Sequence, residues 1–334
     1  MGFKKTGFAA RLLCMFLALV MAQQAFAANV SDDKPRVQVG ILMFDGVQII
    51  DFAGPYEVFG QAGFNVVTIS HNGAPVNTAM GLKVTPDHSF ANAPALDVLL
   101  VPGGEVNEAK DDAAIQRFVR DRSASASKVL SVCTGSFILA SSGVLDGLTA
   151  TTFHNALRSF EATYPKVKVV RDVRWTDNGK VVTSAGLSSG IDAALHLVSS
   201  IRGENAARSA ALLLEYDWKP ESGFVRTRMA DRYMPEFKPA TPWPADMKTR
   251  NLLALGDEHH WQRQIEVRTA MKPDAMLKAL AQSVDALGTW KRTHGAGYAW
   301  VQDTEGKRVN LTVAAPAGKV TEAGFDLDIT IDVR

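Results

Sequence analysis

Cys133 stands directly after the apolar run Lys128–Val132 and directly before the small residues Thr134, Gly135 and Ser136. The run predicts a buried strand and the residues after the glycine predict a helix, which is the strand–turn–helix position of a nucleophile elbow. A thiol there faces the N-terminus of the helix, where free amides and the helix dipole favour the thiolate. The alternative is a buried cysteine that acts as a small hydrophobe. Because such a residue more naturally lies in mid-strand, the position favours a functional thiol.

An acidic residue and a glycine pair stand at two other predicted strand ends. Asp51 lies among isoleucine and phenylalanine side chains just ahead of a Gly-Pro turn. A carboxylate in such surroundings is costly without a partner, and beside a thiol it could share or relay a proton. The alternative role is a helix N-cap or a turn. Gly103 and Gly104 could aim their amides at an anion, as in an oxyanion hole, although the dipeptide alone favours an ordinary turn.

Short apolar runs alternate with amphipathic stretches over the first two thirds of the chain. The runs predict strands at 37–44, 64–70, 97–104, 128–133 and 180–186, and the stretches predict helices at 53–63, 112–124, 134–145, 154–165 and 188–203. Strands that alternate with helices pair in parallel, with crossover helices on both faces of the sheet. Ligands of such sheets bind outside the carboxyl ends of the strands, where the three candidate segments lie.

Four segments resemble the ThiJ/PfpI family of the class I glutamine amidotransferase-like superfamily. They are FDGVQIIDFAGPYEVF (44–59), VPGG (101–104), SVCTGSFILASSGVLDGLTATTFH (131–154) and VTSAGLSSGIDAALHLV (182–198). The likeness runs over roughly residues 37–214, with the elements in the family's order. It implies a flavodoxin-like three-layer α/β sandwich with a mostly parallel sheet, in a domain that spans 28–234.

The resemblance also implies roles for individual residues. Cys133 matches the family's nucleophile and Asp51 the acidic residue that hydrogen-bonds it, while Gly103, Gly104 and Thr134 match the surrounding backbone donors. His154 lies where many members place a histidine near the cysteine, a match that Phe153 and the local register weaken. The family commonly forms dimers, so a homodimer is expected.

The sequence around the cysteine indicates which branch of the family this chain resembles. Proteases and related hydrolases carry Cys-His-Gly at the elbow, whereas this chain has Cys133-Thr134-Gly135, so no adjacent histidine can activate the thiol. Glutaminase domains carry a glycine where Ser131 stands, and a late His-x-Glu pair. The Cys-Thr-Gly form looks most like isonitrile hydratase and like the sensor domain of AraC-type regulators.

The C-terminal third does not look like a DNA-binding module. The proline-rich stretch 235–248 is expected to be a linker, and 249–334 a small α+β domain of unknown role with a helix at 273–293. Residues 245–334 hold 12 basic and 12 acidic residues. This segment therefore lacks the excess of positive charge that is typical of DNA-binding domains. A DNA-binding regulator is therefore disfavoured, and no nucleic-acid partner is expected.

The first 27 residues have the composition of a cleavable bacterial signal peptide. Lys4, Lys5 and Arg11 precede an apolar run and the small-residue sequence Ala25-Phe26-Ala27. The run is too short for a membrane span, so we expect a periplasmic or secreted protein with no stable membrane anchor after cleavage. Without the leader the chain holds 33 basic and 35 acidic residues and a single cysteine. An odd thiol in an exported protein indicates reactivity or an intermolecular partner.

Two functions follow from these patterns. In the first, Cys133 attacks a small electrophile such as an isonitrile, Asp51 handles the proton, and the amides of Gly103, Gly104 and Thr134 stabilise the charge. In the second, a protein of the same fold binds a ligand or senses oxidants through the thiol without turnover. No cofactor or metal is expected. The tract 257–260 holds two adjacent histidines, which would point to opposite sides of a strand, so it predicts a solvated turn.

Overall fold

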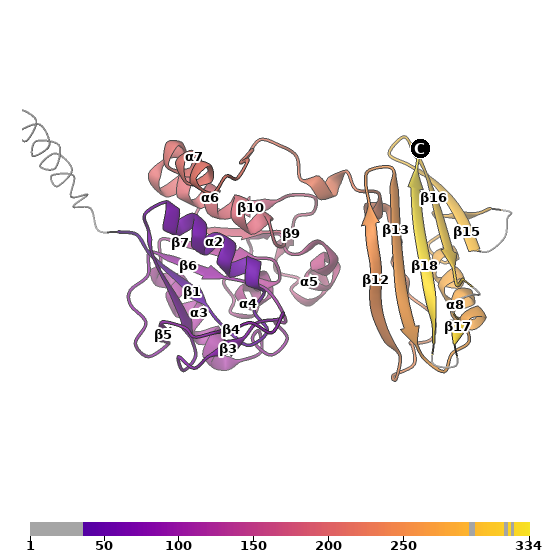
Figure 1. The fold of residues 1–334 in the computed structure, drawn as a ribbon, viewed down its shortest axis with the longest axis horizontal. Helices are drawn as coiled ribbons and strands as arrows, with labels where there is room; N and C mark the ends of the chain where they lie inside the picture. The colour runs from indigo at the N-terminus through magenta and orange to yellow at the C-terminus, as the bar shows by residue number, and fades with distance from the viewer. Residues whose placement is uncertain (1–35, 294–297, 317–319, 322–323) are drawn as a thin grey trace, which may run out of the picture.

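The computed structural model describes residues 36–293, 298–316, 320–321 and 324–334. The predicted leader, 1–27, lies outside the described residues. The described residues form two hydrophobic cores, one between Val39 and Trp218 and one between Ala230 and Val333 (Figure 1). No helix within the described ranges is long and apolar enough to cross a membrane.

A mostly parallel sheet forms the centre of the first domain, as predicted, and it has seven strands. Its strands, in spatial order, are β10 (Trp175–Asp177), β11 (Val181–Ser184), β7 (Lys128–Val132), β6 (Val98–Val101), β1 (Gln38–Leu42), β2 (Asn65–Ser70) and β5 (His88–Ser89). Every neighbouring pair is parallel except β10–β11. Because β1 lies between β2 and β6, the chain reverses direction across the sheet at β1, and such a switch point opens a crevice at the carboxyl ends of the strands.

Helices cover both faces of this sheet (Figure 1). On one face α2 (Ile49–Gln61), α6 (Ser189–Arg202) and α7 (Glu204–Leu213) pack together, and α3 (Ala113–Ser125) and α4 (Gly135–Ser141) lie together on the other. Shorter elements lie beside this sandwich: β3 (Val76–Asn77), β4 (Lys83–Val84), β8 (Thr149–Ala150), η1 (His154–Ala156), α5 (Leu157–Thr163) and β9 (Lys168–Val169). All four residues of β6 are buried, as expected for a strand covered on both sides.

Helix α2 begins earlier than the sequence predicts. The Gly-Pro pair was expected to form a turn after Asp51, but Pro55 lies inside α2 and Asp51 lies in its first turn. Inside a helix, proline removes one hydrogen bond, here the one that would reach the carbonyl of Asp51, and its ring crowds that carbonyl, so tertiary packing must stabilise α2 around Pro55. Asp51 thus projects from a helix that packs on the sheet.

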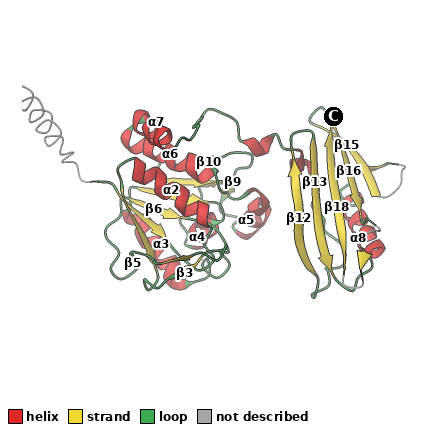
Figure 2. Cartoon of the chain, viewed as in Figure 1, coloured by secondary structure: helices red, strands yellow, loops and turns green. Residues whose placement is uncertain are grey.

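The described residues of the second domain form an antiparallel sheet with one α-helix, which confirms the predicted α+β class (Figure 2). The sheet runs β12 (Lys248–Gly256), β13 (His260–Arg268), β18 (Gly324–Val333), β16 (Lys307–Ala314), β15 (Tyr298–Thr304) and β14 (Lys291–Arg292), with β17 (Val320–Thr321) beside β18. Every second residue of β18 is buried, and that face packs against α8 (Pro273–Asp285), whose buried face includes Leu280 and Val284. Asp257 accepts hydrogen bonds from the amides of His259 and His260, so the tract 257–260 forms the predicted exposed turn between β12 and β13.

The boundary between the domains lies earlier than residue 235. Ala230, in η3 (Ala230–Tyr233), is fully buried in the second core, and its amide donates to the carbonyl of Asp257. Trp243 and Met247 pack against the same core. The stretch 235–248, which was expected to be a linker, therefore packs in part on the second domain, because its apolar side chains contact that core.

Candidate active site

Cys133 occupies a tight turn between β7 and α4. Its φ is 58°, a conformation that is strained for a residue with a side chain and persists only when its surroundings hold it. Its amide lies 3.2 and 3.3 Å from the carbonyl oxygens of Ser184 and Ala185. Its own carbonyl accepts from the hydroxyls of Thr152, at 2.9 Å, and Ser136, at 3.2 Å. These contacts fix the strained turn and hold the thiol at the carboxyl edge of the sheet.

Gly135 allows this turn to lie close to the neighbouring strand end. A Cβ atom at Gly135 would lie 2.1 Å from the carbonyl oxygen of Val101 and 2.8 Å from that of Pro102. Backbone atoms cannot move aside as a flexible side chain can. The sequence predicted a tight turn at this glycine, and the close approach of two backbones gives the physical reason.

Asp51 reaches the thiol from α2 and is fully buried. Its Oδ1 accepts from the amide of Leu187 and its Oδ2 from the amide of Gly103, both at 3.2 Å. The thiol of Cys133 also donates to it. Burial raises the pKa of Asp51 to about 6, although these three hydrogen bonds act in the opposite direction. A carboxyl group with a pKa near neutrality can both accept and return a proton under physiological conditions.

The thiol does not have the lowered pKa that the elbow position predicted. Burial raises the pKa of Cys133, and the negative charge of Asp51 raises it further. The amide and hydroxyl of Thr134 favour the thiolate, but they do not outweigh those effects. The ground state above the pKa of Asp51 is therefore a thiol hydrogen-bonded to a carboxylate, and activation requires that the proton pass to Asp51.

The two glycine amides already have acceptors in this structure. The Gly103 amide donates to Asp51, and the Gly104 amide donates to Oγ1 of Thr134 at 2.9 Å. The Thr134 hydroxyl also lies 3.0 Å from the Gly104 carbonyl oxygen. The expectation that both amides face an anion is therefore not met here. Of the three expected donors, only the Thr134 amide is directed at the sulfur of Cys133.

The phenyl ring of Phe153 lies close to the thiol. A Cβ atom at Gly186 would lie 2.6 Å from Cδ2 of Phe153 and 3.3 Å from Sγ of Cys133, so the phenyl ring and the thiol flank the same glycine. The His154 ring packs edge-on against Phe153, with centroids 4.4 Å apart. Burial and the positive charge of Arg226 lower the pKa of His154 to about 4, so it is neutral at physiological pH.

The loop 185–188 is the part of the site that the sequence analysis missed. It follows β11, the neighbour of the cysteine strand, and Leu187 has a φ of 57°. The signal was present in the run Ser-Ala-Gly-Leu-Ser-Ser, a small-residue turn between a strand and a helix like the one at the cysteine. The parallel pairing of β11 with β7 puts the two turns side by side.

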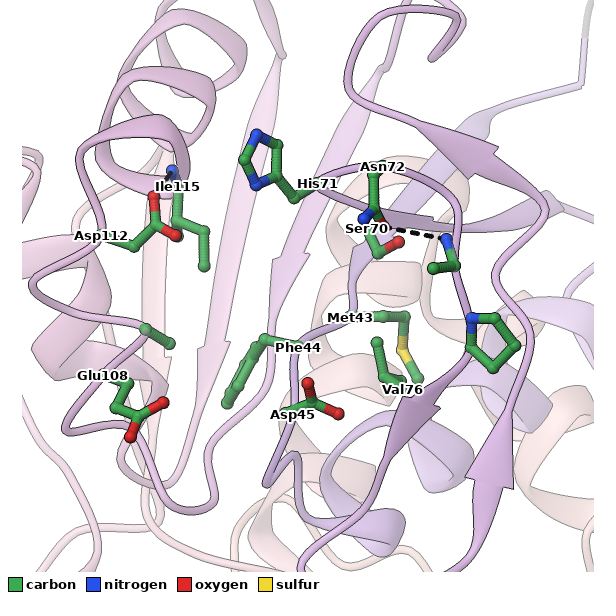
Figure 3. A pocket seen from close by; sticks show the side chains of 13 residues that line it. Met43, Phe44, Asp45, Ser70, His71, Asn72, Val76, Glu108, Asp112 and Ile115 are labelled. Atoms are coloured by element: carbon green, nitrogen blue, oxygen red, sulfur yellow. Dashed lines mark hydrogen bonds between the residues drawn. The ribbon is translucent and has the colours of Figure 1, made fainter.

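Two open hollows lie at the same edge of the sheet. One, of about 580 Å³, is lined by the loops after β1 and β6 and by Thr134. Figure 3 shows the other, of about 280 Å³, between Asp45, His71 and Glu108, with Met43 and Val76 at its apolar side. Cys133 lines neither of these two hollows. Within the described parts of the chain, no three His, Cys, Asp or Glu side chains are grouped to hold a metal ion.

The fold and the elbow define a class of α/β domain with a cysteine at the carboxyl edge of a parallel sheet. Residues 37–200 match the DJ-1/PfpI family model. An isonitrile hydratase from Pseudomonas putida is 37% identical over 185 residues, which are 54% of this chain and 78% of the relative. The chain belongs to the DJ-1/PfpI family.

Two further relatives show the range of this family. The crystal structure of a ThiJ/PfpI family protein from Pseudomonas syringae is similar, with a TM-score of 0.52 and 31% identity over 58% of this chain and 81% of that one. The HTH-type transcriptional regulator GbdR of Pseudomonas aeruginosa is 26% identical over 54% of this chain and 50% of its own length. The similarity thus covers most of the first of these proteins and half of the second.

Proposed function

We propose that this protein is a cysteine-dependent hydratase of a small electrophile, with an isonitrile as the substrate class. One observation carries the proposal: the thiol of Cys133 donates to the fully buried carboxylate of Asp51 at the carboxyl edge of the sheet. A nucleophile and a base in direct contact are the minimum for covalent catalysis. The 37% identity to an isonitrile hydratase supports the choice of substrate.

The hydration proceeds in two steps that need only these two groups and water. Sγ of Cys133 bonds to the terminal carbon of R–N≡C, and the thiol proton, relayed by Asp51, is delivered to the same carbon. The product is a thioimidate, R–N=CH–S–Cys. Water then adds its oxygen to this carbon and supplies one proton to nitrogen and one, through Asp51, to sulfur as the C–S bond breaks. The products are the formamide R–NH–CHO and the free thiol.

The amide of Thr134 would stabilise negative charge on sulfur while the proton is on Asp51, because it already points at Sγ. The hydroxyl of Thr134 holds the Gly104 peptide and so fixes the position of this amide. Phe153 would exclude water from one side of the thiol.

The test is the turnover of a simple alkyl isonitrile by purified protein and three variants. Cys133→Ala should abolish formamide production, and Asp51→Asn should lower it by roughly 10²- to 10⁴-fold, the usual range for a proton-transfer group. The control is Asp146→Asn, which removes an exposed carboxylate paired with Lys166 and should leave turnover unchanged. Full activity in folded Cys133→Ala would reject the proposal.

The regulator relatives favour a second candidate, a ligand-binding protein without turnover. After the family domain, the residues that the structure describes form an antiparallel sheet with one α-helix, which differs from a helix-turn-helix module. In this case a small ligand would slow alkylation of Cys133 with no product formed. Absence of product from isonitriles together with such protection would support this candidate over the hydratase.

We further propose that the protein acts outside the cytoplasm, on the strength of the composition of residues 1–27. Mass spectrometry of protein from a periplasmic extract should give an N-terminus near Ala28. A full-length mass would contradict it.

A further inference from the structure

The guanidinium of Arg174 is buried between three parts of the first domain. Its Nη1 lies 3.1 Å from Oδ2 of Asp192 in α6, and both side chains are at least 88% buried by area. Its Nη2 donates to the carbonyl oxygens of Lys219, Pro220 and Ser222 at 2.7, 2.8 and 2.9 Å. A buried ion pair of this kind stabilises little by itself, but removal of one partner is costly. Arg174 therefore ties α6 to the segment that follows α7.

The backbone of Arg174 holds the loop that carries the Asp51 contact. Its carbonyl accepts from the amide of Ala185 at 2.8 Å, and the carbonyl of Ala185 accepts from the amide of Cys133. Two residues further on, Leu187 donates to Asp51. The loop 185–188 is thus held at its start by the backbone of Arg174. At its end it leads into α6, whose first turn contains Asp192.

The loop needs such support because it is strained. Leu187 has a φ of 57°, and its side chain is 41% exposed, so packing of the leucine does not hold this conformation. A non-glycine residue with such a φ is strained and persists only when its neighbours over-determine it. The two anchors of Arg174 lie on either side of this residue.

We infer that Arg174 is a positioning residue for the thiol site: it fixes the loop 185–188 so that the amide of Leu187 stays on the carboxylate of Asp51. This inference rests on the proposed function for the role of Asp51, but its effect on the thiol can be measured without any substrate. Arg174 touches no reacting atom in this arrangement. The groups that face Asp51 are the thiol of Cys133 and the amides of Leu187 and Gly103, so the loop supplies one of three contacts.

The test is the pH dependence of Cys133 alkylation by iodoacetamide in folded protein. The hydrogen bond from Leu187 lowers the pKa of Asp51. If Arg174→Gln loses this bond, the inflection of the alkylation profile that reports the ionisation of Asp51 should rise by on the order of half a pH unit to one unit. Arg171→Gln is the matched control, because it removes a nearby exposed arginine that pairs with Glu161. It should leave the inflection in place.

A second variant keeps the test decisive if Arg174→Gln does not fold. Asp192→Asn keeps the shape of the side chain but removes the charge that holds the guanidinium, and it should shift the inflection in the same direction by a smaller amount. A merely structural role would lower the stability of these variants without moving the inflection. An unchanged inflection in the folded variants would overturn the inference, whatever the outcome of the isonitrile assay.

Discussion

The carboxylate of Asp51, at the start of α2, accepts a hydrogen bond from the thiol of Cys133, at the end of β7. The two groups share one proton in a buried site, so the charge of each depends on the other. Burial raises the pKa of the thiol, but a group that can accept its proton is already in contact with it. The reactivity of the site therefore depends on Cys133 and Asp51 together.

Asp51→Asn should make the thiol more acidic and, under the proposed function, lower the turnover. The charge of Asp51 and its hydrogen bond both raise the pKa of Cys133, so their removal should lower the alkylation midpoint by about one pH unit or more. Turnover should fall because no base remains to carry the proton. The measurement is the iodoacetamide rate against pH, with Asp146→Asn as control. A midpoint that stays in place would show that the two groups are not coupled.

The same substitution should remove a pH-dependent loss of stability. The pKa of Asp51 rises on folding from 3.8 to about 6, so the unfolded chain releases this proton at lower pH, and stability falls as pH rises through that window. Above it, the cost of ionisation reaches up to about 3 kcal/mol. Asparagine does not ionise, but its amide nitrogen cannot accept from the amides of Leu187 and Gly103 as both carboxylate oxygens do, which adds a loss that does not depend on pH. Urea denaturation should therefore show that the stability of Asp51→Asn relative to the wild type improves between pH 4 and pH 7.5. An equal difference at both pH values would rule out ionisation of Asp51 as a cost to the fold.

The buried strands were predictable because their signal is local. The apolar runs at 97–104 and 128–133 contain β6 and β7, since strands covered on both faces read as continuous hydrophobic stretches. Helix α7 was missed because Gly203 alone separates it from α6. Strand β12 was missed because its residues are nearly all exposed and show no alternation of polar and apolar residues.

The members of the site were more predictable than their contacts. Cys133 and Asp51 stand out by residue type and position at strand ends, and the structure brings them together. The acceptors of Gly103 and Gly104 depend on side chains far away in the sequence, and the burial that raises the thiol pKa comes from the whole fold. The helix dipole can be inferred from the local sequence, but the burial of the thiol cannot. The sequence alone therefore does not show which of the two has the larger effect on the pKa of Cys133.

Gly103→Ala should damage both stability and turnover. The new methyl carbon would lie 2.6 Å from the Thr134 amide nitrogen and 2.9 Å from Oδ2 of Asp51, atoms that are fixed by the elbow and by burial. We expect a loss of roughly 1–3 kcal/mol in the free energy of unfolding. Gly60→Ala is the matched control, because nothing lies within 4 Å of its Cβ position in α2 and alanine favours a helix. Equal stability of the two variants would contradict the close approach at Gly103.

His154 should be neutral during turnover, and Arg226 should contribute to this. Burial and the Arg226 charge lower its pKa to about 4. Arg226→Gln should raise that pKa without restoring 6.5, because the burial remains. Titration of the His154 ring by NMR measures it. An unchanged pKa would mean that Arg226 does not act on this ring in solution.

The Ala230 side chain fills part of the second core, and its amide donates to the carbonyl of Asp257. A segment that is to carry the second domain intact into another protein must therefore begin before η2 (Val225–Thr227). A fusion joined at residue 249 would leave that core open on one side. A junction near Gly223 would include all the residues that cover this core, so the domain boundary of this chain lies before its proline-rich stretch.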